Sequence, residues 1–329
     1  MEQGTLGELY LTRSVTKHIR KYNKAVAIGS GVGKDYSLIK TAGDYMILSE
    51  AVAETPFIAW AKALNNLYVS GGNVAGVRIC YMLPVGTDEG ELKNYAACFN
   101  ELAHRDSIQI VGGNTMVSSA YSRPSFLVEA IGDVTRDNAL AFKAKADYQI
   151  VMVGYTGVLG TNLIVDEKAK ELRERFAESY VAGCKFPDEG YSVRAMVERV
   201  NSIKCDAEVV YMHDVSYGGL YGGLWQLGEA LRLGVSIDHR NIPIKQETVE
   251  ICNYFDINPY MLEGTGALLV VARDGDRIAE TLSQEGYKAA VIGTLTQNKD
   301  RVVVLNAEGE KRFLAPVKGD EIYKVISAY

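Results

Sequence analysis

The sequence predicts a two-domain protein of the α+β class, and three observations support this. The chain has 329 residues, which is long for one domain and comfortable for two. Short apolar strands and helices with apolar residues three and four apart follow one another in the order β-α-β-α-β-β, which favours an α+β layer over a strictly alternating parallel sheet. The polar, charge-rich passage 132–148 then precedes a new strand. We therefore expect domains at residues 1–145 and 146–329.

The first domain is expected to contain five strands and two helices. Phe57, Trp60 and Leu64 have helical spacing, and Gly71–Gly72 is a helix stop. Pro84 ends the strand that follows this helix. The predicted strands are 24–33, 43–56, 75–84, 107–115 and 125–134, and the predicted helices are 57–72 and 88–106.

The second domain is also expected to consist of strands and helices that follow one another. A strand at 148–157 enters a glycine turn, and a long charged helix is expected near 165–180. A strand at 207–215 runs into a glycine-rich helix start at 216–234. The segment 266–295 reads as strand, helix and strand, with Gly286 closing the helix.

Composition limits the partners of this chain. A net charge of −6 argues against a general nucleic-acid or acidic-membrane partner, because phosphate binding needs a basic field. No apolar run reaches the roughly 18–20 residues of a membrane span, and no signal peptide is recognisable. The five cysteines are widely spread without a C-x-x-C pair, which indicates reduced thiols and a cytoplasmic protein.

The glycine-rich segment "GSGVGKDYSLIK" is the first candidate site. Its glycines, Gly29, Gly31 and Gly33, could direct backbone amides at an anion, and Lys34 would add positive charge next to Asp35. The spacing is neither that of a Walker A loop nor that of a dinucleotide fingerprint. A plain glycine turn between two strands is the alternative.

Two further candidates lie on the elements that follow. Glu50 and Glu54, four residues apart, could both face a metal if the segment turns, or could form a solvated acidic turn. Asn65 and Asn66 are poor helix formers inside a good helical pattern, which indicates a site or a locally unfavourable helix.

The strand "IVGGNT" brings polar groups to a strand end. Gly112 and Gly113 allow close approach to the backbone, and Thr115 follows. Asn114 stands where a carboxylate would hold a metal, and an uncharged amide holds a metal less well.

The most specific local signal lies in the second domain. His213 and Asp214 precede Gly218–Gly219 and a helix start, where free amides and a partial positive charge attract anions. His213 could bind phosphate or move a proton. A polar end to the strand is the alternative.

In their order, these stretches resemble motifs of the AIR-synthetase-like superfamily over nearly the whole chain. The glycine loop resembles that family's G-x-G-D-D-A loop, "SEAVAE" its T-D-x-x-V segment, "LNNLYVSGG" its N-D-[LI]-x-x-x-G helix and "IVGGNT" its G-G-D-T motif. "HDVSYGGLYGGLWQLGEALRLG" is similar to the D-P-T-R-G-G-L-A segment of the branch of the hydrogenase maturation factor HypE. Members also include thiamine-monophosphate kinase.

The resemblance implies an N-terminal mixed sheet that forms a barrel-like interface in a homodimer, followed by a C-terminal α/β sandwich domain. It implies ATP as cofactor and phosphorylation or dehydration of a small or carbamoyl-type substrate, with a hydrogenase maturation protein as partner. Its implied catalytic residues are Lys34, His213 and Asp214. The implied nucleotide-binding residues are Gly29, Gly31, Gly33, Asp35, Asn65, Asn66, Gly112, Gly113, Asn114 and Thr115.

The sequence departs from the family at its metal-binding positions. Lys34, Asn66 and Asn114 each stand where the family has an aspartate, so fewer Mg²⁺ ions than usual are expected. Asp35 and Glu50 would hold at most one ion, and the Lys34 ammonium could balance the triphosphate instead. The chain ends "EIYKVISAY" without the terminal cysteine of HypE, so we expect no thiocyanate formation by that route. The alternatives are a catalytically inactive, nucleotide- or anion-binding dimeric scaffold and a small-molecule kinase of the thiamine-monophosphate kinase type.

Overall fold

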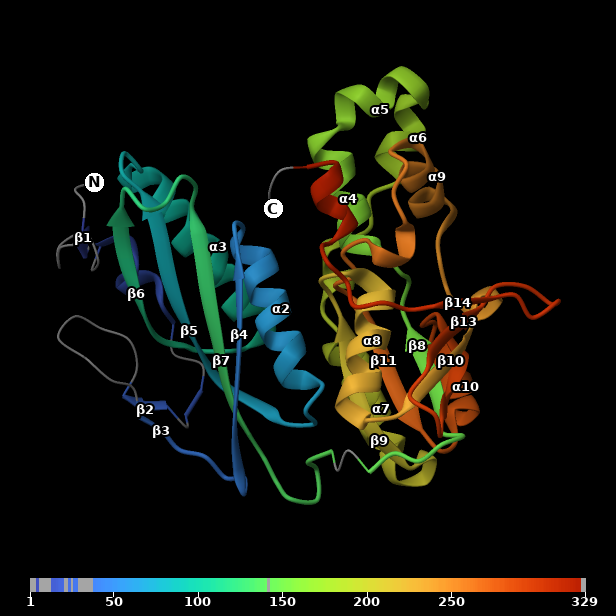
Figure 1. The fold of residues 1–329 in the computed structure, drawn as a ribbon. Coiled ribbons are helices and arrows are strands. Elements are labelled where there is room, and N and C mark those ends of the chain that lie inside the picture. Colours follow the sequence, from blue (N-terminus) through green and yellow to red (C-terminus); the bar gives the residue numbers. More distant parts are fainter. Residues whose placement is uncertain are drawn as a thin grey trace. The chain divides into compact units, whose positions relative to one another are not determined.

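The computed structural model describes residues 4–5, 13–20, 23–24, 26–28, 38–140 and 143–326. The chain forms two compact units that divide between Ala139 and Leu140 (Figure 1). Each unit has its own sheet with helices packed on it, which confirms the α+β class. No helix among these residues is long and apolar enough to cross a membrane.

The N-terminal unit contains the predicted mixed sheet. Its strands follow the order β1-β6-β5-β7-β4, and β5 and β6 are parallel while the other neighbours are antiparallel. The bounds are β1 Gly4–Thr5, β4 Tyr45–Ala53, β5 Asn73–Pro84, β6 Ile110–Ser118 and β7 Ser125–Val134. A separate antiparallel pair joins β2, Val26–Ile28, to β3, Leu38–Ile39.

Two helices cover one face of this sheet. Helix α2, Pro56–Tyr68, begins with a proline, which has no amide hydrogen to leave unpaired at that position. Helix α3, Glu89–Asp106, begins with a capping box between Asp88 and Glu91. The core beneath them includes an aromatic cluster of Trp60, Tyr81, Phe99 and Phe126.

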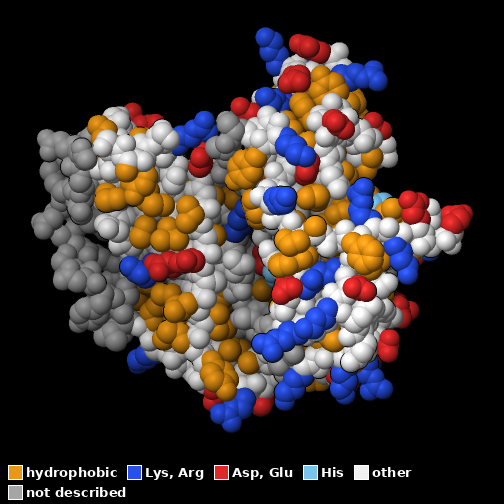
Figure 2. All heavy atoms as spheres, viewed as in Figure 1, with side chains coloured by type: hydrophobic (Ala, Val, Ile, Leu, Met, Phe, Trp, Pro, Cys, Tyr) orange, Lys and Arg blue, Asp and Glu red, His pale blue; other side chains and the backbone are white. Residues whose placement is uncertain are grey.

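The opposite face of the sheet, which we call the open sheet face, is not covered by these helices. Successive strand residues point to opposite faces, so the neighbours of the buried positions form this surface. On β4, Met46, Leu48 and Val52 are 64%, 71% and 59% exposed. Figure 2 shows hydrophobic side chains gathered over this unit. Exposed apolar area of this kind is typical of an interaction surface.

The C-terminal unit is a sheet with helices on both faces. Its strand order is β14-β13-β10-β12-β8-β11-β9. The strand bounds are β8 Gln149–Val153, β9 Val209–Val215, β10 Gly234–Asp238, β11 Ala267–Ala272, β12 Ala289–Thr296, β13 Arg301–Val304 and β14 Lys311–Phe313. The principal helices are α7 Arg194–Ala207, α8 Gly219–Leu231, α9 Gln246–Tyr254 and α10 Gly275–Gln284.

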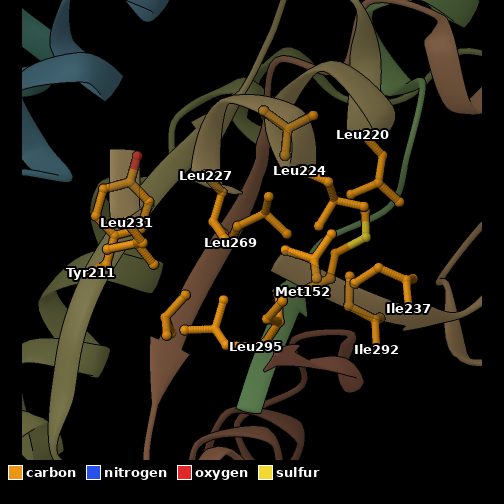
Figure 3. Close-up of a cluster of buried hydrophobic side chains, with 14 of the residues drawn as sticks. Met152, Tyr211, Leu220, Leu224, Leu227, Leu231, Ile237, Leu269, Ile292 and Leu295 are labelled. Atoms are coloured by element: carbon orange, nitrogen blue, oxygen red, sulfur yellow. The ribbon is translucent and has the colours of Figure 1, made fainter. Parts of the chain in front are cut away.

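Helix α8 and the sheet enclose the main core of this unit. Leucines of α8 meet Met152, Leu269 and Ile237 of three different strands, and all of these side chains are buried (Figure 3). Helix α10 lies over the other face, because a Cβ at Gly275 would meet Val151 at 2.9 Å. Gly286 follows α10 with φ +89°, as predicted for the residue that closes this helix.

The prediction of one long charged helix near 165–180 is wrong. The segment forms three short helices, α4 Val158–Glu167, α5 Ala169–Arg175 and α6 Glu178–Gly183. Phe176 is extended at φ −116° and ψ 150°, which separates α5 from α6. Its ring stacks on Tyr180 and contacts Tyr254 edge-on, so tertiary aromatic packing overrides the local helical pattern.

Gly113 illustrates how tightly β6 is held against β5. A Cβ at this position would lie 1.8 Å from the Ile79 carbonyl oxygen, and its φ is +149°. Gly113→Ala should therefore lower the free energy of unfolding by at least about 2 kcal/mol. Urea denaturation measures this, with Gly183→Ala as control because a Cβ there meets nothing within 4 Å. Equal stability of the two variants would contradict the account.

Candidate functional site

A row of charged side chains crosses the open sheet face. Glu50 of β4 lies opposite Glu129 of β7, and Glu129 lies opposite Arg78 of β5. Arg78 donates from Nη1 to Glu129 Oε2 at 2.7 Å. Adjacent carboxylates on neighbouring strands repel one another, and Arg78 balances Glu129. Among the described residues, Glu50 has no ion-pair partner, so it is the charge on this row that is open to a cation.

Asn114 lies on the same face, at the far side of the sheet. Its Oδ1 accepts a hydrogen bond from the backbone amide of Thr115 at 2.8 Å, and its side chain is exposed. Thr115 points to the buried face. Gly112 is half-buried and lies opposite Arg78, so the "IVGGNT" strand runs beside the charged row.

The expected site residues of this unit do not share one centre. Glu50 and Asn114 are separated by three strand spacings of ~4.8 Å, or about 14 Å. Ser49 donates to the Ala63 carbonyl of α2 at 2.7 Å, so its neighbour Glu50 points away from that helix. Asn65 is buried in α2 and Asn66 is exposed on it, both apart from the open sheet face. The described part of the chain holds no group of three or more His, Cys, Asp or Glu residues placed for a metal.

The glycine-loop candidates lie outside the described residues. These are Gly29, Gly31, Gly33, Lys34 and Asp35, between β2 and β3 in the sequence.

In the C-terminal unit, His213 and Asp214 lie next to each other on β9. The pleat of the strand directs their side chains to opposite faces of the sheet. His213 faces α8, where its Nε2 lies 2.9 Å from Gln226 Oε1 and its ring stacks on Tyr211. Asp214 is buried on the other face. The pKa of Tyr211 is raised to about 12, first by burial and then by the charge of Asp214.

The N-terminus of α8 holds an anion that belongs to the protein. Asp320 Oδ2 accepts from the backbone amide of Gly218 at 2.6 Å. Its Oδ1 accepts from the amides of Glu263 and Ile322 at 3.0 and 2.9 Å. Sequence reasoning missed Asp320, because it lies 102 positions from Gly218. The carboxylate therefore occupies the place where an anion was expected from the glycine pattern.

The surroundings of Asp320 affect the pKa of its carboxyl group in two opposite directions. Burial, followed by the nearby carboxylate of Glu263, raises its pKa to about 6, while three backbone amides act in the opposite direction. Glu263 is fully buried and accepts from the amide and hydroxyl of Thr265 at 3.2 and 2.7 Å. This pair of buried acids fixes the loop before β11 and the segment after β14.

Comparison with protein families identifies the C-terminal region. Residues 156–306 match the family described as AIR synthase related protein, C-terminal domain.

Two curated relatives match most of the chain. A putative hydrogenase expression/formation protein of Methanocaldococcus jannaschii is 24% identical over 273 residues, which are 82% of this chain and 78% of the relative. The carbamoyl dehydratase HypE of Azotobacter vinelandii is 22% identical over 265 residues, which are 77% and 74% of the two chains.

Solved structures show the same fold. The hydrogenase maturation protein HypE in complex with ATP superposes with a TM-score of 0.78 at 17% identity, covering 95% of both chains. A chain of a HypE–HypF complex gives 0.69 at 18% identity and covers 82% and 90%. Thiamine-monophosphate kinase of Stenotrophomonas maltophilia gives 0.67 at 18% identity and covers 87% and 92%.

The raised pKa of Asp320 predicts a specific pH dependence. Because the folded pKa is about 6 and the ordinary value is 3.8, the stabilising contribution is complete below pH 4 and is lost as the pH rises through 6. Relative to Asp320→Asn, the wild type should lose up to about 3 kcal/mol of unfolding free energy between pH 4 and 7. Urea denaturation across this range measures it, with the exposed Asp300→Asn as control. Parallel curves for wild type and Asp320→Asn would show that Asp320 does not titrate there.

Proposed function

We propose that this chain, whose residues 156–306 match the C-terminal domain of AIR synthase related proteins, binds ATP and uses it to activate a small, carbamoyl-type substrate in hydrogenase maturation. The observation that carries this proposal is the likeness to ATP-bound HypE over 95% of both chains. The relatives named for hydrogenase expression support the same process. The HypE–HypF complex supports another maturation protein as a partner. The five free thiols agree with a cytoplasmic location.

The triphosphate would be bound largely by the glycine loop. Amides of Gly29, Gly31 and Gly33 would point at the phosphates, and Lys34 would supply a positive charge that Mg²⁺ supplies elsewhere. Asp35 and Glu50 would share at most one ion. Glu50 supports this role because it has no ion-pair partner in the described parts of the chain, unlike Glu54, which lies 3.5 Å from Arg123.

The open sheet face supports a homodimer. Its exposed apolar residues share this face with the Arg78–Glu129 ion pair, and covering exposed apolar area with a second surface lowers the free energy. We propose that a second copy of this chain covers this face and thereby encloses the charged row.

A nucleotide-binding scaffold without turnover is the second candidate function. One observation favours it: within one copy, Glu50, Asn66 and Asn114 are too far apart to hold a metal together. A small-molecule kinase has support from the fold of thiamine-monophosphate kinase. Hydrolysis or transfer of the ATP γ-phosphate separates the enzyme from the scaffold.

The proposed site predicts ATP binding that depends little on Mg²⁺. Isothermal titration should give dissociation constants within about threefold with Mg²⁺ and with EDTA, because Lys34 replaces part of the metal charge. Glu50→Gln should abolish ATP hydrolysis above background, whereas Glu54→Gln should leave it intact. Binding that disappears in EDTA would overturn the role of Lys34. Binding without hydrolysis would favour the scaffold.

The proposed dimer predicts a concentration-dependent mass that one charge can disrupt. Leu48→Glu places a carboxylate in the open sheet face and should weaken association at least tenfold, since an unpaired buried charge is costly. Val85→Glu is the control, because Val85 is also exposed but lies in the turn after β5. Sedimentation velocity measures both. A monomeric wild type at all concentrations would contradict the proposal.

A further inference from the structure

A cavity of about 540 Å³ opens within the C-terminal unit, formed by residues of this unit alone. Its walls come from the start of α8, the short helices at His239–Asn241, Pro259–Met261 and Glu321–Lys324, and the β13–β14 hairpin. This volume falls in the usual range for small-molecule sites, roughly 300–1,000 Å³. Neither the expected phosphate-binding residues nor the acids around Asp320 account for it.

One wall of the cavity is aromatic. Tyr221 and Tyr260 stack with ring centroids 5.3 Å apart and 16° between their planes. His239 contacts Tyr260 edge-on at 4.6 Å. Burial lowers the pKa of His239, Asp238 acts in the opposite direction and Arg312 lowers it further, so the neutral imidazole is favoured. Met261 and Leu305 add apolar surface. This wall therefore suits the ring of an aromatic ligand.

Two cations line the cavity, Arg312 and Lys324, and they differ in whether a described residue pairs with them. Lys324 is held by both carboxylate oxygens of Glu321, at 2.8 and 2.7 Å. Arg312, in contrast, forms no ion pair with any residue that the structure describes. It lines the cavity together with Tyr221 and His239, so its guanidinium group is available beside the aromatic wall. A planar guanidinium beside an aromatic wall is suited to bidentate binding of a carboxylate or phosphate.

We propose that this cavity binds a planar aromatic molecule with one anionic group, whose anion lies on Arg312 and whose ring lies against Tyr260 and His239. The charged groups of the cavity limit the ligand to a single charge, because Lys324 is already paired with Glu321 and Arg312 is the cation left for an anion among these lining residues. Asp256 and Glu321 also line it, so a second negative charge on the ligand would be repelled. An aromatic carboxylate therefore fits better than an aromatic phosphate dianion.

The probes that test this inference are 4-hydroxybenzoate, phenyl phosphate, uncharged 4-hydroxybenzyl alcohol and inorganic phosphate. With the full chain, titration followed by NMR should show 4-hydroxybenzoate binding more tightly than phenyl phosphate, and neither the alcohol nor inorganic phosphate binding comparably. Arg312→Gln should weaken 4-hydroxybenzoate binding at least tenfold, because it removes a charge-assisted bidentate contact. The neighbouring exposed Lys311→Gln, which does not line the cavity, should bind as the wild type does.

The thermal midpoint of each variant checks that the fold is intact, and ATP titration of Arg312→Gln separates this cavity from the proposed nucleotide site. The inference is overturned if 4-hydroxybenzoate does not bind at millimolar concentration. It is also overturned if the alcohol binds equally well, or if both substitutions have the same effect.

Discussion

The C-terminal unit depends on one buried carboxylate, that of Asp320. Three backbone amides from α8, the loop before β11 and the final short helix converge on it, so it joins segments that no strand pairing connects. The surrounding glycines serve this same junction, because a Cβ at Gly219 would lie 2.5 Å from the Leu262 carbonyl oxygen. Burial, and then the carboxylate of Glu263, oppose the ionised form while the three backbone amides favour it, which leaves the pKa of Asp320 near 6. A glycine-rich helix start that would otherwise bind an external anion is thus already satisfied.

The layers of the fold could be predicted because they depend on local periodicity. Helical spacing of Trp60 and Leu64 placed α2, and the apolar run before Pro84 placed β5. The pattern failed at 165–180, where charged residues looked like one helix but Phe176 leaves the helical conformation to reach two aromatic rings. Helix α7 was not recognised at all. The information that decides such segments lies in residues distant in the sequence.

The candidate site was less predictable, for the same reason. The glycines of "IVGGNT" indicated that another group lies close to the backbone of this strand. Such a group is present at Gly113, but it is the Ile79 carbonyl oxygen of the neighbouring strand. His213 and Asp214 looked like one constellation, yet adjacent strand residues face opposite ways. Arg78 and Glu129 gave no local signal, since their pairing depends on the register of two strands 51 residues apart. The order of the motifs indicated the resemblance to a family more readily than it showed which residues lie together in a site.

The open sheet face links the proposed dimer to the proposed nucleotide site. Covering Met46, Leu48 and Val52 with a second copy would remove water from the charged row as well. Arg78 already satisfies Glu129, so Glu50 would become a desolvated charge with no partner among the described residues. Such a charge is tolerated when a cation accompanies it into the interface. Lys34, a metal ion or a residue of the second copy could each meet this need at Glu50. The free energy of dimerisation therefore depends on whether a cation accompanies Glu50 into the interface.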